Sequence, residues 1–130
     1  MIAFCTHCFA EIDSEDQLCP YCKADFSTDS RSYENKLMAA LEHPLPEARA
    51  RICWLLGENN IRSAVPKLMY AAAHDPDLFV KKSAIEALVV LRDPLSYSLL
   101  QQIGEGGNYF LQAAAKKMFE DIDSTKGTHP

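Results

Sequence analysis

Four of the five cysteines in this 130-residue chain form two closely spaced pairs near its N-terminus. The pairs are Cys5-Thr6-His7-Cys8 and Cys19-Pro20-Tyr21-Cys22, with ten residues between them. Two intervening residues let a tight turn direct both sulfur atoms at one point, and two such turns supply four thiolates to a tetrahedral metal ion. We therefore predict that Cys5, Cys8, Cys19 and Cys22 are metal ligands. So short a segment buries too little apolar surface to fold unaided, and metal binding would supply the missing stability.

The segment resembles the short zinc-ribbon family, whose pattern is Cys-x-x-Cys-Gly, a hydrophobic residue, and Cys-Pro-x-Cys-Gly. The four cysteines, Ile12 and Pro20 match this pattern, whereas Phe9 and Lys23 stand where the family usually has glycine. Because glycine relaxes the backbone of such turns, the two replacements predict strained turns or a displaced left-handed residue. The resemblance implies a structural zinc ion with no open coordination position for catalysis.

Other interpretations of the cysteines stay open. The segment is also similar to the short rubredoxin-like segments of the rubrerythrin family, which implies iron held by the same four residues. A redox dithiol would use one Cys-x-x-Cys pair beside a βαβ pattern, and no such pattern accompanies these pairs. His7 could replace a cysteine, but four cysteines already suffice, so we expect an exposed turn residue. The predicted cofactor is zinc, with iron as the alternative.

A short polar linker, residues 27–32, separates the cysteine segment from the rest of the chain. Runs of Ala, Leu, Lys, Glu and Arg then alternate with Pro, Gly, Asn and Asp, which is typical of helices separated by turns. Similar stretches recur at a spacing of 31 or 32 residues, which indicates a solenoid of helical hairpins. The expected fold class is mostly α, with six helices at about 33–43, 46–58, 63–74, 77–91, 94–104 and 108–121.

The helical region resembles the short HEAT-like repeats of the phycobilisome-lyase type over roughly residues 33–122. The residues that carry the resemblance are Leu56-Gly57-Glu58, then Ser63-Ala64-Val65-Pro66-Lys67-Leu68, with Leu91-Arg92-Asp93-Pro94 at the equivalent loop of the next repeat. The resemblance implies that helices 33–43, 63–74 and 94–104 line a concave face.

Four polar or aromatic residues are expected to point outward from that face and to bind a partner. They are Lys67, Tyr70, Gln101 and Gln102. Tyr70 is the strongest candidate, because its equivalent in the previous repeat is Ala39 and the scaffold therefore does not need an aromatic side chain there. Aromatic residues are common anchors of interfaces.

The other chemically active residues form no catalytic constellation, so we expect a protein that is not an enzyme. The four histidines are far apart in the sequence; His43 and His74 occupy equivalent repeat positions, where a cation suits a helix C-terminus. Cys53 lies in an apolar helix and is expected to be a buried small hydrophobe. The adjacent Trp54 is interpreted as a core residue.

The whole net charge of −5 lies in residues 1–30, which carry six acidic residues and one basic residue. This sign argues against binding to a phosphate backbone. The first residues lack the features of a signal peptide, and no apolar run is long enough to cross a membrane. We therefore expect a cytoplasmic protein, in which cysteines bind metal more often than they form disulfides.

Together these patterns predict a zinc ribbon (1–26), a linker (27–32), a HEAT-like solenoid (33–122) and a flexible tail (123–130). The expected function is a non-catalytic adapter or accessory subunit that binds another protein. Two alternatives remain: an iron-binding, rubredoxin-like electron carrier on a repeat scaffold, and a phycobilin-lyase-like enzyme, which rests on fold resemblance alone. The partner and the oligomeric state are left open by the sequence.

Overall fold

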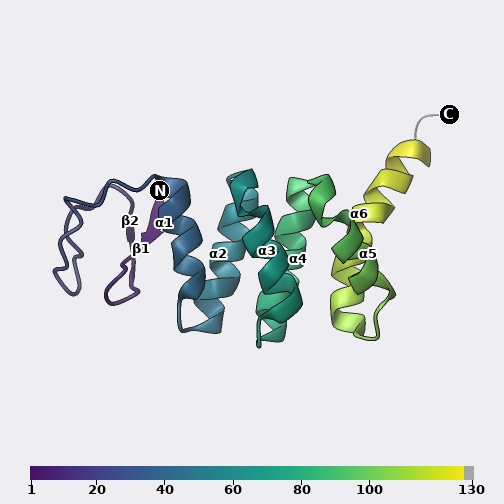
Figure 1. The fold of residues 1–130 in the computed structure, drawn as a ribbon, viewed down its shortest axis with the longest axis horizontal. Helices are drawn as coiled ribbons and strands as arrows, with labels where there is room; N and C mark the ends of the chain where they lie inside the picture. Colours follow the sequence, from purple (N-terminus) through teal and green to yellow (C-terminus); the bar gives the residue numbers. More distant parts are fainter. Residues whose placement is uncertain (128–130) are drawn as a thin grey trace.

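Helices stacked side by side make up most of the chain, and a small two-stranded segment stands at one end of the row (Figure 1). The computed structural model describes the backbone of residues 1–127 and the side chains as far as Phe119. The fold is mostly α, as predicted. In chain order the elements are β1 (Ile2–Phe4), β2 (Glu11–Asp13), α1 (Tyr33–Ala39), η1 (Ala40–Glu42), α2 (Pro46–Glu58), η2 (Arg62–Ala64), α3 (Val65–His74), α4 (Leu78–Leu91), η3 (Pro94–Ser96), α5 (Tyr97–Glu105) and α6 (Tyr109–Gly127).

The helices lie close to the predicted ranges and differ from them at some of their ends. The first helix ends in a tighter 3₁₀ turn, η1, and the helices predicted at 63–74 and 94–104 each begin in such a turn, η2 and η3. The last helix, α6, continues to Gly127 and not to about residue 121. Residues 128–130 of the expected tail lie outside the described residues.

Local capping explains where several helices begin and end. The side chain of Ser32 accepts a hydrogen bond from the N–H of Asn35 (3.1 Å) and so caps α1. Asp77 caps α4 in the same way, because its carboxylate accepts bonds from the N–H groups of Phe79 and Val80 at 2.9 and 3.1 Å. At the other end, Arg92 adopts a left-handed conformation (φ 51°), which ends α4.

The hydrophobic core runs along the row because α4 contacts α2, α3 and α6. Leu56 on α2 and Leu88 on α4 are both fully buried in it. Helices α2 and α4 approach closely at Gly57: a Cβ built there would lie 3.0 Å from the Cα of Ala87 and 3.1 Å from its Cβ. The hydroxyl of Ser83 adds a hydrogen bond to the carbonyl of Ala50 (2.8 Å), which ties α4 to α2.

The cysteine segment (residues 1–26) packs against the first two helices. Its strands β1 and β2 pair antiparallel, with Ala3 opposite Ile12. Ile2 and Phe4 on β1 pack against the helical core, and the hydroxyl of Tyr33 on α1 donates to the carbonyl of Ile2 (2.8 Å). An ion pair between Arg51 on α2 and Glu11 on β2 (2.8 Å) adds a second link. The segment therefore covers the end of the helical stack at α1.

One interpretation of the sequence is wrong. Trp54 is predicted in the core, but its side chain is 55% exposed on α2. Its neighbours in sequence, Cys53 and Leu55, are buried instead. A helix presents only part of its circumference to the core, and Trp54 lies in line with the exposed Arg51 and Glu58 on the opposite side.

The contact between α2 and α4 makes a prediction for Gly57→Ala. The added methyl group must displace Ala87, and the cost of this overpacking exceeds the gain in helix propensity, for a net loss of about 1 kcal/mol in the free energy of unfolding. Gly107→Ala is the control, because nothing lies within 4 Å of the position that its Cβ would take, and it should change stability by less than about 0.5 kcal/mol. Urea unfolding measures both, and equal values for the two variants would contradict the close packing.

Candidate metal centre and helical groove

The first Cys-x-x-Cys pair forms a compact turn just after β1. The N–H of Cys5 donates to the carbonyl of Ala10 (2.9 Å), and the N–H of Phe9 donates back to the carbonyl of Cys5 (3.0 Å). Inside the turn, the N–H groups of His7 and Cys8 both point at the sulfur of Cys5, at 3.3 Å each. Such N–H groups stabilise negative charge on the sulfur.

The second pair repeats this turn bond for bond. Cys19 donates to the carbonyl of Ala24 (2.9 Å) and accepts at its own carbonyl from Lys23 (3.0 Å). The N–H groups of Tyr21 and Cys22 point at the sulfur of Cys19, at 3.4 Å each. Identical spacing in the sequence thus produces the same bonding pattern, and the two turns face each other.

The residues that replace glycine keep the left-handed position. Phe9 has φ 65° and Lys23 has φ 68°, both in the region that favours glycine. Of the two outcomes expected from the sequence, a strained turn is the one found, and the left-handed residue is not displaced. Each such residue costs about 1 kcal/mol or more, so the interactions of the turn must offset that cost.

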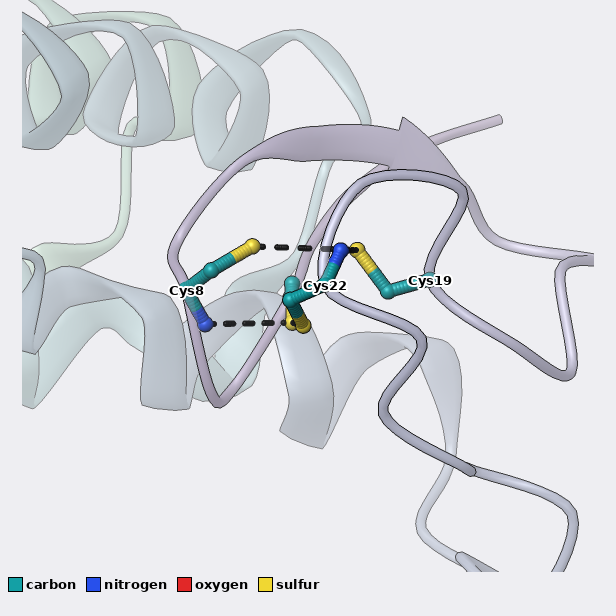
Figure 2. A group of neighbouring side chains, drawn as sticks. Cys8, Cys19 and Cys22 are labelled. Carbon is teal, nitrogen blue, oxygen red and sulfur yellow. Dashed lines mark hydrogen bonds between the residues drawn. The ribbon is translucent and has the colours of Figure 1, made fainter.

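The four sulfur atoms converge on one point between the turns. All of them lie within 4.8 Å of one another; the sulfurs of Cys5 and Cys22 are 3.6 Å apart, and those of Cys8 and Cys19 are 3.7 Å apart. Figure 2 shows Cys8 and Cys19 turned toward each other from opposite loops. A tetrahedron with metal–sulfur bonds of about 2.3 Å has sulfurs about 3.8 Å apart. The four cysteines are therefore compatible with a tetrahedral metal site.

The same geometry divides the thiols into two kinds. Burial raises the pKa of the Cys19 thiol, but the hydrogen bonds from the N–H groups of Cys22 and Tyr21 have the larger combined effect. The resulting pKa is about 6, below the ordinary value of a thiol. The N–H of Ala10 lowers the pKa of Cys8, but burial and the neighbouring sulfurs raise it to about 12. In each pair the first cysteine, Cys5 or Cys19, has a lowered pKa. The second cysteine, Cys8 or Cys22, has a raised pKa. The first cysteines favour thiolates, and the charge of a bound metal would deprotonate the second ones.

A second candidate site is a groove of about 390 Å³ between α1 and α3, which we call the α1–α3 groove. Lys67 and Tyr70 line it from α3, and both side chains are exposed. Gln101 lies elsewhere, in a depression between α5 and α6 beside Gly104 and Lys116. Gln102 is exposed on α5. The structure thus brings two of the four predicted partner-binding residues together and leaves the other two on a separate part of the molecule.

Other residues, most of which the sequence did not single out, complete the groove. Its other lining residues are Met38, Leu41, Glu42, Arg49, Ala71, His74, Asp75, Pro76 and Val80. At one end, Arg49 forms an ion pair with Asp75 through two hydrogen bonds, at 3.0 and 3.3 Å. These residues are 26 apart in the chain, and the pair joins α2 to the loop before α4. No pattern in the sequence identifies such a pair, although both residues are charged and close to turns.

The two histidines expected at helix ends differ in their surroundings: His74 lies in the last turn of α3, as predicted, whereas His43 follows η1 and is held by backbone groups. His43 is 4% exposed, and its Nδ1 accepts a hydrogen bond from the N–H of Leu45 (3.1 Å). Its Nε2 therefore carries the hydrogen and donates to the carbonyl of Phe9, 2.9 Å away. His74, at the equivalent repeat position, is exposed and contacts only the ring of Tyr70 among the aromatic side chains described. Of these two histidines, His43 alone reaches the cysteine segment, and His7 is exposed as expected.

Comparison with known proteins identifies the helical part of the chain. A family model for HEAT repeats matches residues 34–118. The chain therefore belongs to the HEAT-repeat family. No curated protein and no solved structure matches it. Within the described residues, none of the helices combines the length and apolarity that a membrane crossing requires.

The metal centre makes a prediction for Cys19→Ser. Loss of one thiolate should abolish stoichiometric metal binding and unfold residues 1–26, because the turns then lack the interaction that offsets their left-handed residues. Most of the helical circular dichroism signal should remain, since the main packing between helices is that of α4 against α2 and α3, away from the cysteine segment. Elemental analysis after dialysis measures the metal, and Cys53→Ala, outside the cluster, should retain it. Loss of the whole helical signal in Cys19→Ser would show that the segment and the helices fold as one unit.

The remaining cysteine makes a prediction about reactivity. Burial raises the pKa of Cys53 to about 12. At pH 8 a rise from about 9 lowers the thiolate fraction about 1000-fold, so alkylation by iodoacetamide should slow at least that much relative to unfolded protein. Mass spectrometry of metal-loaded protein, in which the other four thiols are protected, measures the rate. Alkylation of native Cys53 at the unfolded rate would contradict its burial.

Proposed function

We propose that this protein is a non-catalytic adapter or accessory subunit that binds another protein through its helical face. In this proposal residues 1–26 form a zinc ribbon, residues 27–32 connect it to the helices, and residues 33–122 form the binding scaffold. The observation that carries the proposal is the α1–α3 groove, with an exposed tyrosine on its wall. HEAT repeats commonly present such preformed helical surfaces, and a preformed surface binds with little ordering cost.

Tyr70 is the residue on which we base the binding surface. Its side chain is 70% exposed and lies beside His74, with ring centroids 4.8 Å apart. The core of α3 is supplied by other residues, among them the buried Leu68 and Ala72. An aromatic ring that the fold does not require, on the wall of a partly apolar groove, is well placed to anchor a partner.

The proposed cofactor is zinc, in a structural role. Four thiolates complete a tetrahedral coordination sphere, so a bound zinc ion would have no position for water or substrate. The N–H groups directed at Cys5 and Cys19 would hold these two ligands in place. Iron in the same four thiolates is the alternative, and it would make the protein an electron carrier.

A non-catalytic role also agrees with the other reactive side chains. Cys53 is buried and its pKa is raised, so it is a poor nucleophile. Both ring nitrogens of His43 are engaged by backbone groups. All five cysteines have free thiols, which fits the reducing cytoplasm proposed as the location.

The proposal is tested by comparing partner capture between two tyrosine variants. Bait protein is incubated with extract of its own cells, and captured proteins are quantified by mass spectrometry. Tyr70→Ala should lower capture of the specific partner at least about tenfold, which is typical of an interface anchor. Tyr109→Ala is the matched control, because Tyr109 is 86% exposed but lies on α6 outside the groove. Equal capture by wild type and Tyr70→Ala would reject this surface.

The cofactor is tested on protein purified untagged from its own cells. Elemental analysis should find one zinc per chain, and the absorption spectrum should show no band in the visible range. One iron per chain and a red colour would favour the electron carrier. A bound bilin with its own absorption band would favour the lyase-like alternative.

A further inference from the structure

We propose that metal binding in the cysteine segment controls the shape of the α1–α3 groove through His43, Arg49 and Asp75. The proposal rests on the proposed function of the groove and concerns its regulation. It is carried by a continuous series of hydrogen bonds that begins one residue after a metal-binding cysteine and ends in the groove wall.

The series begins at Phe9, which directly follows Cys8. The left-handed conformation of Phe9 is held by the bond from its N–H to the carbonyl of Cys5, inside the first turn. The turn therefore sets the direction of the Phe9 carbonyl, which accepts from His43 at 2.9 Å. The rings of Phe4 and Phe9 enclose the imidazole edge-on, with centroids 5.8 and 5.0 Å away.

The loop after η1 transmits this contact to the helices. His43 is bonded at both ring nitrogens, so the position of the ring fixes the loop through the N–H of Leu45. Arg49 on α2 donates to the carbonyls of His43 (3.0 Å) and Pro44 (3.2 Å). The same guanidinium group binds both carboxylate oxygens of Asp75 in the next repeat.

The series ends in residues that line the groove. Arg49 and Asp75 are largely buried, with side chains 16% and 10% exposed, and both line the α1–α3 groove beside Glu42 and Pro76. Asp75 also accepts from the N–H of Asp77, at the start of α4. A shift of the loop at His43 therefore moves groove residues on both repeats, because buried charged pairs tolerate little change in geometry.

The equivalent position in the next repeat shows that the connection is specific. His74 precedes a Pro-containing turn as His43 does, but it is exposed and its ring faces Tyr70. The two histidines share their type and repeat position and differ in their contact with the cysteine segment. His74 thus offers a matched control.

The first test measures thermal unfolding of the helices by circular dichroism, in zinc-loaded protein and after removal of zinc with a chelator. In wild type and in His74→Leu, zinc removal should lower the helical Tm by about 5 °C. In His43→Leu, zinc removal should lower it by clearly less, about half as much or less, because the path through His43 is broken while the contacts of Ile2, Phe4 and Glu11 with the helices remain. The proposal is overturned if zinc removal leaves the wild-type Tm unchanged, or shifts His43→Leu as much as wild type.

A second measurement needs no variant and applies even if His43→Leu does not fold. Hydrogen exchange of the Leu45 N–H, which is bonded to His43, should accelerate at least about tenfold when zinc is removed. Exchange of the Asn59 N–H, bonded to the carbonyl of Leu55 at the far end of α2, should stay the same. Unchanged exchange at Leu45 would overturn the proposal.

Partner capture separates this proposal from the proposed function. If zinc removal and Tyr70→Ala each reduce capture at least about tenfold, both proposals are supported. If only Tyr70→Ala reduces capture, the groove binds a partner but the metal does not control it. If Tyr70→Ala captures as well as wild type, the proposed binding surface is wrong whatever the metal does.

Discussion

The packing of α4 against both α2 and α3 joins the repeats and sets the positions of the surfaces around them. Its buried leucines, with the close approach of Gly57 to Ala87, fix the spacing between the repeats. That spacing places α1 beside α3 and so creates the groove between them. It also leaves α1 at one end of the row with a surface that no further helix covers within the described residues (Figure 1).

The cysteine segment covers that surface, and solenoids need such a terminal cap because their end repeats lack a neighbour. Ile2 and Phe4 supply apolar contacts, while Tyr33 and His43 bond to backbone carbonyls of the segment. A segment with so little apolar surface is a weak cap by itself, and a metal held by four thiolates would make it rigid. The cysteine cluster, which could hold a metal ion, and the helical scaffold are therefore complementary parts of one structure.

Much of this arrangement could be predicted from local patterns. The helix ranges followed from the spacing of apolar residues and from Pro, Gly and Asp at the turns, because these signals act within a few residues. The cysteine cluster followed for the same reason, since each turn is built from neighbouring residues. Trp54 was misplaced because periodicity shows that a helix has an apolar side without showing how far the core extends around it.

Local sequence patterns were enough to predict most of the helices, the four clustered cysteines and the helical repeat. Other features became visible only in the folded chain: Lys67 and Tyr70 share a groove while Gln101 lies apart, and His43 contacts Phe9 while His74 does not. The physical reason is that these contacts join residues from different repeats or from the cysteine segment and a helix. Their geometry depends on how the repeats stack and on which end of the stack carries the cysteine segment, and neither is encoded in any local stretch of the chain.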